Sequence, residues 1–370
     1  MRIPLPCAYK KRVPATGMPA GTYFCHPMKK QSCLLLFLIA GLLSGFAQTA
    51  PTHYGLLRQI PLGGNDSWDY CISDDSLHHL FVSHGNLVQV VDEQTGKMCG
   101  AITEVNGVHG IALAADLGKG YISNGKDSSV TVFRLKDFQV IGHIAVTGRN
   151  PDAILYDAFT HQVITFNGKS SNATFINAYT DAVTGTLALP GKPDFAVTDE
   201  DGNVFVNIEN KNLLCVIDPM GKRLEKSYPV GTGESPSGLA IDRNSNRLFI
   251  GCDNKLLVVL NPADGKIVAT LPIGEGVDAV KFDPDAQRIF ASNGDGTLTV
   301  ISESGPDQYA VLENIKTQPG ARTMAVNIQT HHLYLPVAQR GPTPAPTADH
   351  PHPRPSIVPD TFIILEYQPK

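Results

Sequence analysis

One repeat of about 42 residues runs along most of this 370-residue chain and constrains its fold more than any other feature. Seven segments align on a short block that precedes an apolar run, and the middle residues of the blocks fall at positions 69, 109, 152, 194, 237, 278 and 322. A period kept this regularly is typical of an architecture in which each unit packs against its neighbours. We therefore expect one repeat domain, although the length alone would allow two or three domains.

Every repeat has the same internal order of strands and turns. A short apolar strand such as 239–241 leads through a polar turn into a second strand, which ends in a tetrad of aromatic, aliphatic, small and polar residues. A branched third strand follows, and a fourth strand comes after a Gly turn. The 34 Gly, 27 Pro and 18% charged residues suit many short strands joined by turns. The sequence predicts an all-β fold, a seven-bladed β-propeller with four-stranded blades.

The tetrads also carry a family resemblance. Residues 121–124 (Tyr-Ile-Ser-Asn) and 290–293 (Phe-Ala-Ser-Asn) are the clearest examples. They resemble the YVTN repeat of secreted bacterial and archaeal seven-bladed propellers, and the similarity extends over residues 55–367. The resemblance implies the propeller fold and does not define a function. Three tetrads depart from the pattern because they end in Ile208, Cys252 and Val337, so the terminal Asn has no general role here.

The two ends of the repeat region predict how the ring closes. The last repeat stops after a third strand near 361–367, and residues 57–63 resemble the outer strand 268–274. We therefore expect the N-terminal strand to complete the last blade, which removes an exposed sheet edge. Residues 51–370 are predicted to form this single domain, with a Pro-rich insertion at 340–359 and a monomeric state.

The N-terminal segment has the features of a secretory leader. Met28 and two lysines precede an eleven-residue apolar run, and Gly45 and Ala47 occupy the −3 and −1 positions of a cleavage site. Residues 28–47 are predicted to be a signal peptide, and residues 1–27 an extension upstream of the natural start, with a genuine long leader as the alternative. The mature protein is expected to be periplasmic or secreted, without a membrane span.

The repeat also predicts where a ligand would bind. The residues at the repeat's middle positions start the first strands, which line the channel of a propeller, and His84 and Asn124 end second strands on the same face. Lysines recur in the loops after the second strands. The candidate ligand-binding residues are Trp68, Asp69, His84, His109, Asp152, Asp194, Asp278, Arg322, Lys126 and Lys169.

Four of these residues are candidate metal ligands. Asp69, His84, His109 and Asp152 offer two imidazoles and two carboxylates, the ligand types that suit Zn²⁺ or Mn²⁺. The alternative is that the aspartates hydrogen-bond the amides of tight turns between blades. The lysines have two interpretations as well, a positive collar for an anionic ligand or ordinary solvated turns. His350 and His352 in the Pro-rich insertion would approach the site if that segment folds over the channel.

These observations favour a binding module for a small ligand, a peptide or a partner protein. No nucleophile elbow, phosphate-binding loop, dinucleotide fingerprint or zinc-protease motif occurs in the sequence. The alternative function is a metal-dependent, lactonase-like hydrolase, a hypothesis that rests on fold analogy. Nucleic acid is not an expected partner, because the net charge is −5 and no aromatic residues accompany the lysines. Cys71, Cys99, Cys215 and Cys252 are predicted to be buried apolar residues rather than a disulfide framework.

Overall fold

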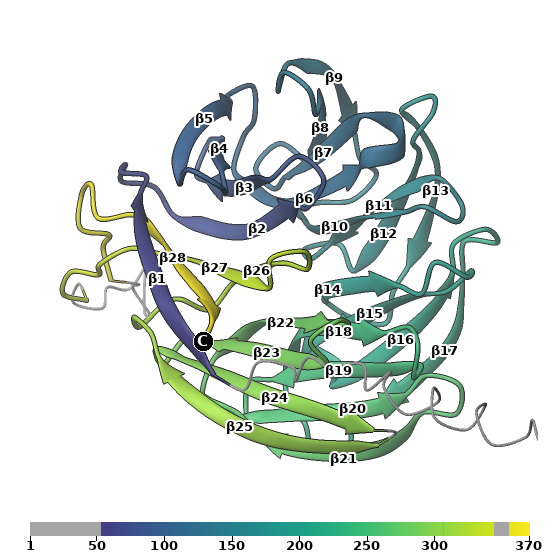
Figure 1. Ribbon diagram of the computed structural model, residues 1–370. Helices are drawn as coiled ribbons and strands as arrows, with labels where there is room; N and C mark the ends of the chain where they lie inside the picture. The colour runs from purple at the N-terminus through teal and green to yellow at the C-terminus, as the bar shows by residue number, and fades with distance from the viewer. Residues whose placement is uncertain (1–52, 306, 344–354) are drawn as a thin grey trace, which may run out of the picture. The chain divides into compact units, whose positions relative to one another are not determined.

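The computed structural model describes residues 53–305, 307–343 and 355–370. Within them the chain forms seven antiparallel sheets of four strands each, arranged as blades around a common centre (Figure 1). The predicted all-β, seven-bladed propeller is confirmed. The leader predictions for residues 1–27 and 28–47 lie outside the described residues. No helix in the described part is long and apolar enough to cross a membrane.

Each of the first six blades is built from four strands that follow one another in the chain. Blades one and two contain β2 (Trp68–Asp74), β3 (His79–His84), β4 (Leu87–Asp92), β5 (Lys97–Ile102), β6 (Val108–Ala114), β7 (Lys119–Asn124), β8 (Ser129–Arg134) and β9 (Val140–Ala145). Blades three and four contain β10 (Pro151–Asp157), β11 (Gln162–Asn167), β12 (Asn172–Asn177), β13 (Ala182–Ala188), β14 (Pro193–Thr198), β15 (Val204–Ile208), β16 (Leu213–Asp218) and β17 (Arg223–Pro229). Blades five and six contain β18 (Pro236–Asp242), β19 (Arg247–Cys252), β20 (Leu256–Asn261), β21 (Lys266–Pro272), β22 (Val277–Asp283), β23 (Arg288–Asn293), β24 (Thr297–Gly305) and β25 (Gln308–Lys316).

The seventh blade joins the two ends of the domain, as the sequence predicts. It contains β26 (Ala325–Asn327), β27 (His332–Val337), β28 (Ile363–Pro369) and, as its outer strand, β1 (Tyr54–Pro61), which lies against β28 in Figure 1. Their register pairs Tyr54 with Pro369 and Pro61 with Ile363. Because β26 also contacts β2 and β22, the ring of first strands is closed.

The core lies between neighbouring blades, and the first tetrad residue supplies much of it. Phe81, Tyr121, Phe249 and Phe290 are all fully buried. Burying one such side chain contributes roughly 2 kcal/mol, so each blade interface is held by several apolar side chains from both sides. Two short 3-10 helices, Ala115–Leu117 and Glu209–Lys211, are the remaining regular elements of the described residues.

Two further sequence predictions have mixed outcomes. In the Pro-rich insertion, Arg340 and Ile357 form a β-bridge, whereas His350 and His352 lie outside the described residues. The prediction of buried cysteines holds for three of four. It is wrong for Cys99, which is exposed because it lies on the outer strand β5.

Candidate functional site

A β-bulge near the start of the first strand positions the candidate site residues. In β2, Trp68 pairs with His84 and Cys71 pairs with Val82, so Asp69 and Tyr70 together face Ser83. The first strands of blades two to six show the same register shift. A bulge bends the strand and redirects the extra side chain. The repeated bulge therefore gives blades one to six an equivalent position at one end of the channel.

The small polar residue of the tetrad holds this bulge in place. The Ser83 hydroxyl accepts from the Asp69 amide at 3.2 Å and donates to the Tyr70 carbonyl at 2.8 Å. Ser123 accepts from the Gly110 amide and donates to the Asp152 carbonyl of the next blade at 2.6 Å. These hydroxyls satisfy backbone groups that the bulge removes from the strand ladder. Ser83 and Ser123 are thus positioning residues for the site.

At this end of the channel lies a cavity of about 390 Å³, which we call the upper cavity. It is lined by side chains from several blades and by the 3-10 helix Glu209–Lys211. The acidic side chains that line it are Asp69, Asp152, Asp194, Glu209, Asp253 and Asp278. Against these six carboxylates, Lys192 and Arg322 are the lysine and arginine side chains of the lining among the described residues. The upper cavity is therefore strongly acidic.

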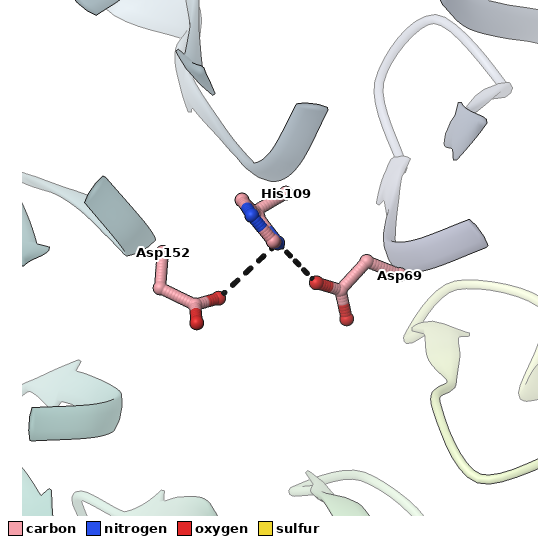
Figure 2. A group of neighbouring side chains, drawn as sticks. All are labelled: Asp69, His109 and Asp152. Atoms are coloured by element: carbon pink, nitrogen blue, oxygen red, sulfur yellow. Dashed lines mark hydrogen bonds and ion pairs between the residues drawn. The ribbon is translucent and has the colours of Figure 1, made fainter. Parts of the chain in front are cut away.

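Asp69, His109 and Asp152 converge in the upper cavity from three consecutive blades (Figure 2). The Nδ1 atom of His109 lies 2.6 Å from Asp69 Oδ2 and 3.6 Å from Asp152 Oδ1. One ligand atom from each residue can be chosen so that all three lie within 4.8 Å of one another. The backbone at Gly125 passes so close to the ring that a Cβ there would lie 2.5 Å from His109 Nε2, so only glycine fits. The imidazole is thus fixed between two carboxylates.

The acid–base properties of the cluster follow first from burial and then from the neighbouring charges. Burial, together with the negative charge of Asp69, raises the pKa of Asp152 to about 6. Burial raises the pKa of Asp278 to about 6 as well, although Arg322 opposes the shift. Burial alone would lower the pKa of His109, but its hydrogen bond to Asp69 and the charge of Asp152 outweigh it and raise the pKa. Near pH 6 the cavity therefore changes charge.

Two cations form ion pairs with acidic side chains of the upper cavity, and one hydroxyl donates a hydrogen bond to another. Lys192 pairs with Glu209, and Arg322 Nε lies 3.1 Å from Asp278 Oδ2. Tyr70 donates from its hydroxyl to Asp194 Oδ1 at 3.4 Å, a long hydrogen bond. Burial and the nearby carboxylates raise the pKa of Asp194 well above its ordinary value. These contacts are between side chains, so they support the interpretation of the aspartates as site residues over that of amide-binding turn residues.

The prediction that His84 joins the metal ligands is wrong. His84 is 3% exposed and its ring stacks on Phe362 with centroids 4.3 Å apart. Its Nδ1 contacts Gln89 Oε1 at 3.1 Å, and its Nε2 contacts the Asp66 carbonyl at 3.0 Å. The equivalent Asn124 bonds Ser129 and Thr131 of its own blade in the same way. His84 and Asn124 therefore both bond to the third strand of their own blade and lie outside the lining of the upper cavity.

Trp68, Lys126 and Lys169 also stay outside the lining of the upper cavity. Trp68 packs on Phe362 and under the Arg340 guanidinium. Lys126 contacts Asn86 Oδ1 at 3.5 Å in an exposed loop. Lys169 faces the site only at longer range, where its charge acts to lower the pKa of His109. The positive collar is thus reduced to Lys192 and Arg322, each paired with an acid.

Sequence reasoning did not include Tyr70 and Glu209 among the site residues. Tyr70 directly follows Asp69, and Phe195 holds the corresponding place after Asp194, whereas the other blades have Gly110, Ala153, Gly238, Ala279 and Thr323 there. The two rings meet with centroids 5.4 Å apart. Their size against small residues elsewhere is a signal that the repeat alignment contains. Glu209 has no such signal, because it lies in an irregular loop helix.

Comparison with known proteins defines the fold and no more. No known family model matches the chain, and no curated protein matches it. Among solved structures, U3-55K matches with a TM-score of 0.70 at 11% identity, over 84% of this chain and 98% of that one. Hydrazine synthase of Kuenenia stuttgartiensis matches with a TM-score of 0.64 at 14% identity, over 73% of this chain and 92% of that one. At these identities the likeness shows a shared propeller fold.

Proposed function

We propose that this protein is a propeller binding module whose upper cavity takes a cationic group, presented by a small ligand, a peptide or a partner protein. The observation that carries the proposal is the excess of carboxylates over cations in a concave site at the channel mouth. Carboxylates whose pKa is raised by burial and by mutual repulsion gain free energy when a cation enters. Carboxylates that the fold crowds together, so that their pKa values are raised, are typical of functional sites.

Calorimetry on the full-length protein tests this proposal with defined cations. At pH 7.5 we expect 1,4-diaminobutane, Mn²⁺ or Zn²⁺ to bind, and Asp152→Asn and Asp194→Asn to weaken the binding about tenfold or more. Asp285→Asn is the matched control, because Asp285 is an exposed turn residue outside the cavity lining. Equal affinity in all variants, or no binding of any of the three cations, would contradict the proposal.

A second candidate function is a metal-dependent, lactonase-like hydrolase. The convergence of Asp69, His109 and Asp152 favours it, since one imidazole and two carboxylates suit Zn²⁺ or Mn²⁺. Such an ion would supply an activated water, and the three side chains would hold it. Stoichiometric metal in the purified protein, lost in His109→Ala but kept in His84→Ala, would support this function. Lactone hydrolysis that survives His109→Ala would contradict it.

We also propose that the protein is exported from the cytoplasm and belongs to the YVTN type of propeller. The basic and apolar leader at residues 28–47 and the YVTN-like tetrads support an exported, monomeric propeller of that type. N-terminal sequencing of the protein recovered outside the cytoplasm tests this directly. We expect the mature chain to begin at Gln48 or close to it, and an uncleaved cytoplasmic protein would contradict the expectation.

A further inference from the structure

The same channel contains a second cavity, of about 270 Å³, which we call the lower cavity. The first strands of blades one to six line it, further along the chain from the bulges. Tyr70 lines both cavities, and its ring contacts Phe195, which lines the lower cavity. In contrast to the acidic upper cavity, most of this lining is aliphatic or aromatic.

One side chain breaks the apolar pattern of the lower cavity. Lys281 pairs across β22 and β23 with Phe290, the first tetrad residue of blade six. The residues at the same register in the other blades are all aliphatic, namely Ile72, Ala112, Leu155, Val197, Ala240 and Ala325. A lysine at this one position of seven adds a positive charge to an apolar wall.

The charge of Lys281 has no acidic counterpart among the described residues. Its Nζ lies 4.7 Å from the centroid of the Phe195 ring, a cation–π contact. The other charges of the lining, Arg243 and Glu200, neutralise each other at 2.8 Å. Burial lowers the pKa of Lys281, and the Cys71 thiol is the one group that opposes this shift. A desolvated ammonium without an anion gains free energy when an anion enters the cavity.

We propose that the lower cavity binds a small apolar monocarboxylate, whose carboxylate pairs with Lys281 and whose apolar body packs against Tyr70, Phe195 and the aliphatic wall. A single uncompensated cation favours a monoanion over a phosphate or a dianion. Apolar walls with one placed polar group are the usual composition of a small-molecule site. The site is separate from the upper cavity and selects the opposite charge.

Calorimetry with two probes of nearly the same form tests the proposal on the full-length protein at pH 7. We expect 3-phenylpropanoate to bind at least about tenfold more tightly than 3-phenylpropan-1-ol, which lacks the charge. This comparison needs no variant. Equal affinities for the acid and the alcohol, or no binding of the acid, would overturn the proposal.

Variants of Lys281 then test whether the acid binds in the lower cavity. Lys281→Met should lower the affinity for the acid about tenfold or more and leave the alcohol unchanged, and Lys281→Arg should keep the preference for the acid. Lys316→Met is the matched control, because it removes the same charge from an exposed position at the end of β25. Unchanged acid binding in a folded Lys281→Met protein would overturn the assignment, as would an equal loss in Lys316→Met.

Discussion

The two ends of the central channel have opposite chemistry although the first strands of the same six blades contribute to both. Among the described residues, the upper cavity holds six carboxylates, whereas the lower cavity is mainly apolar and contains Lys281, a cation without an acidic partner. Tyr70 lines both cavities, and Phe195 lines the lower one. The bulged start of each first strand directs polar side chains into the upper cavity, and the regular part beyond it carries aliphatic residues.

This difference shows how a repeat can carry two sites. The period fixes which positions face the channel, and single substitutions at one position then set the chemistry of one end without changing the other. His109 among the ring aspartates and Lys281 among aliphatic residues are both exceptions to their register. Each exception introduces a charge that the fold alone does not require, and such departures from local consistency are typical of functional sites.

The largest effect on stability is expected from a substitution that weakens the closure of the ring, on which both cavities depend. Arg58 of β1 pairs with Glu366 of β28, whose side chain is fully buried, and it also donates to the Glu93 carbonyl. Arg58→Met should destabilise the protein by about 3 kcal/mol, because it removes the arginine from a buried carboxylate and leaves it the imidazole of His332, 2.8 Å away.

Urea unfolding measures the effect of Arg58→Met, with ligand binding as a second readout. Both cavities should lose affinity only in proportion to the unfolded fraction. Arg223→Met is the control, since Arg223 is a mostly exposed arginine whose ion pairs contribute about 1 kcal/mol or less. If Arg58→Met abolished binding at one end and not at the other in the folded protein, closure would not support both ends equally.

A neutral residue in the upper cavity should stabilise the protein at alkaline pH. The pKa of Asp152 is raised from 3.8 to about 6, so the folded state holds this proton more tightly than the unfolded state does. Stability contributed by the protonated carboxyl is therefore present at low pH and is lost as the pH rises through 6. Asp152→Asn should gain about 2–3 kcal/mol at pH 8 and almost nothing at pH 4.

Denaturant unfolding at the two pH values checks the prediction for Asp152. Asp253→Asn is the matched control, because Asp253 borders the same cavity but is exposed. In this control, the change in stability caused by the substitution should be nearly the same at pH 8 and at pH 4. Destabilisation by Asp152→Asn at pH 8 would mean that the contact with His109 outweighs the repulsion from Asp69.

The lower cavity should respond to pH in the opposite direction. Burial lowers the pKa of Lys281 below its ordinary 10.5, so the unfolded state binds this proton more tightly and the charged lysine destabilises the folded state. Lys281→Met should stabilise the protein by about 1–2 kcal/mol at pH 7. The gain should shrink as the pH approaches 10.5. A constant gain from pH 7 to pH 10.5, measured by urea unfolding, would mean that packing rather than charge is responsible.

The fold and part of the upper cavity could be predicted from the sequence because both depend on the repeat. The strand order is local to each blade. Asp69, Asp152, Asp194 and Asp278 occupy the same position of the repeat. The prediction for His84 failed because the last tetrad residue bonds to the neighbouring strand, a direction that spacing does not reveal. Lys281 went unnoticed because one polar residue within an apolar strand leaves the strand pattern intact.

The smallest effect is expected at Tyr70, the residue that borders both cavities. Its hydroxyl donates to Asp194 at 3.4 Å, which is long for a hydrogen bond, and its ring contacts Phe195. Tyr70→Phe keeps the ring, so the free energy of unfolding, measured by thermal unfolding, should change by less than about 0.5 kcal/mol. Cation binding in the upper cavity should change about twofold, because Asp194 loses a donor, and 3-phenylpropanoate should bind as before. If acid binding also changed, the Tyr70 hydroxyl would couple the two cavities.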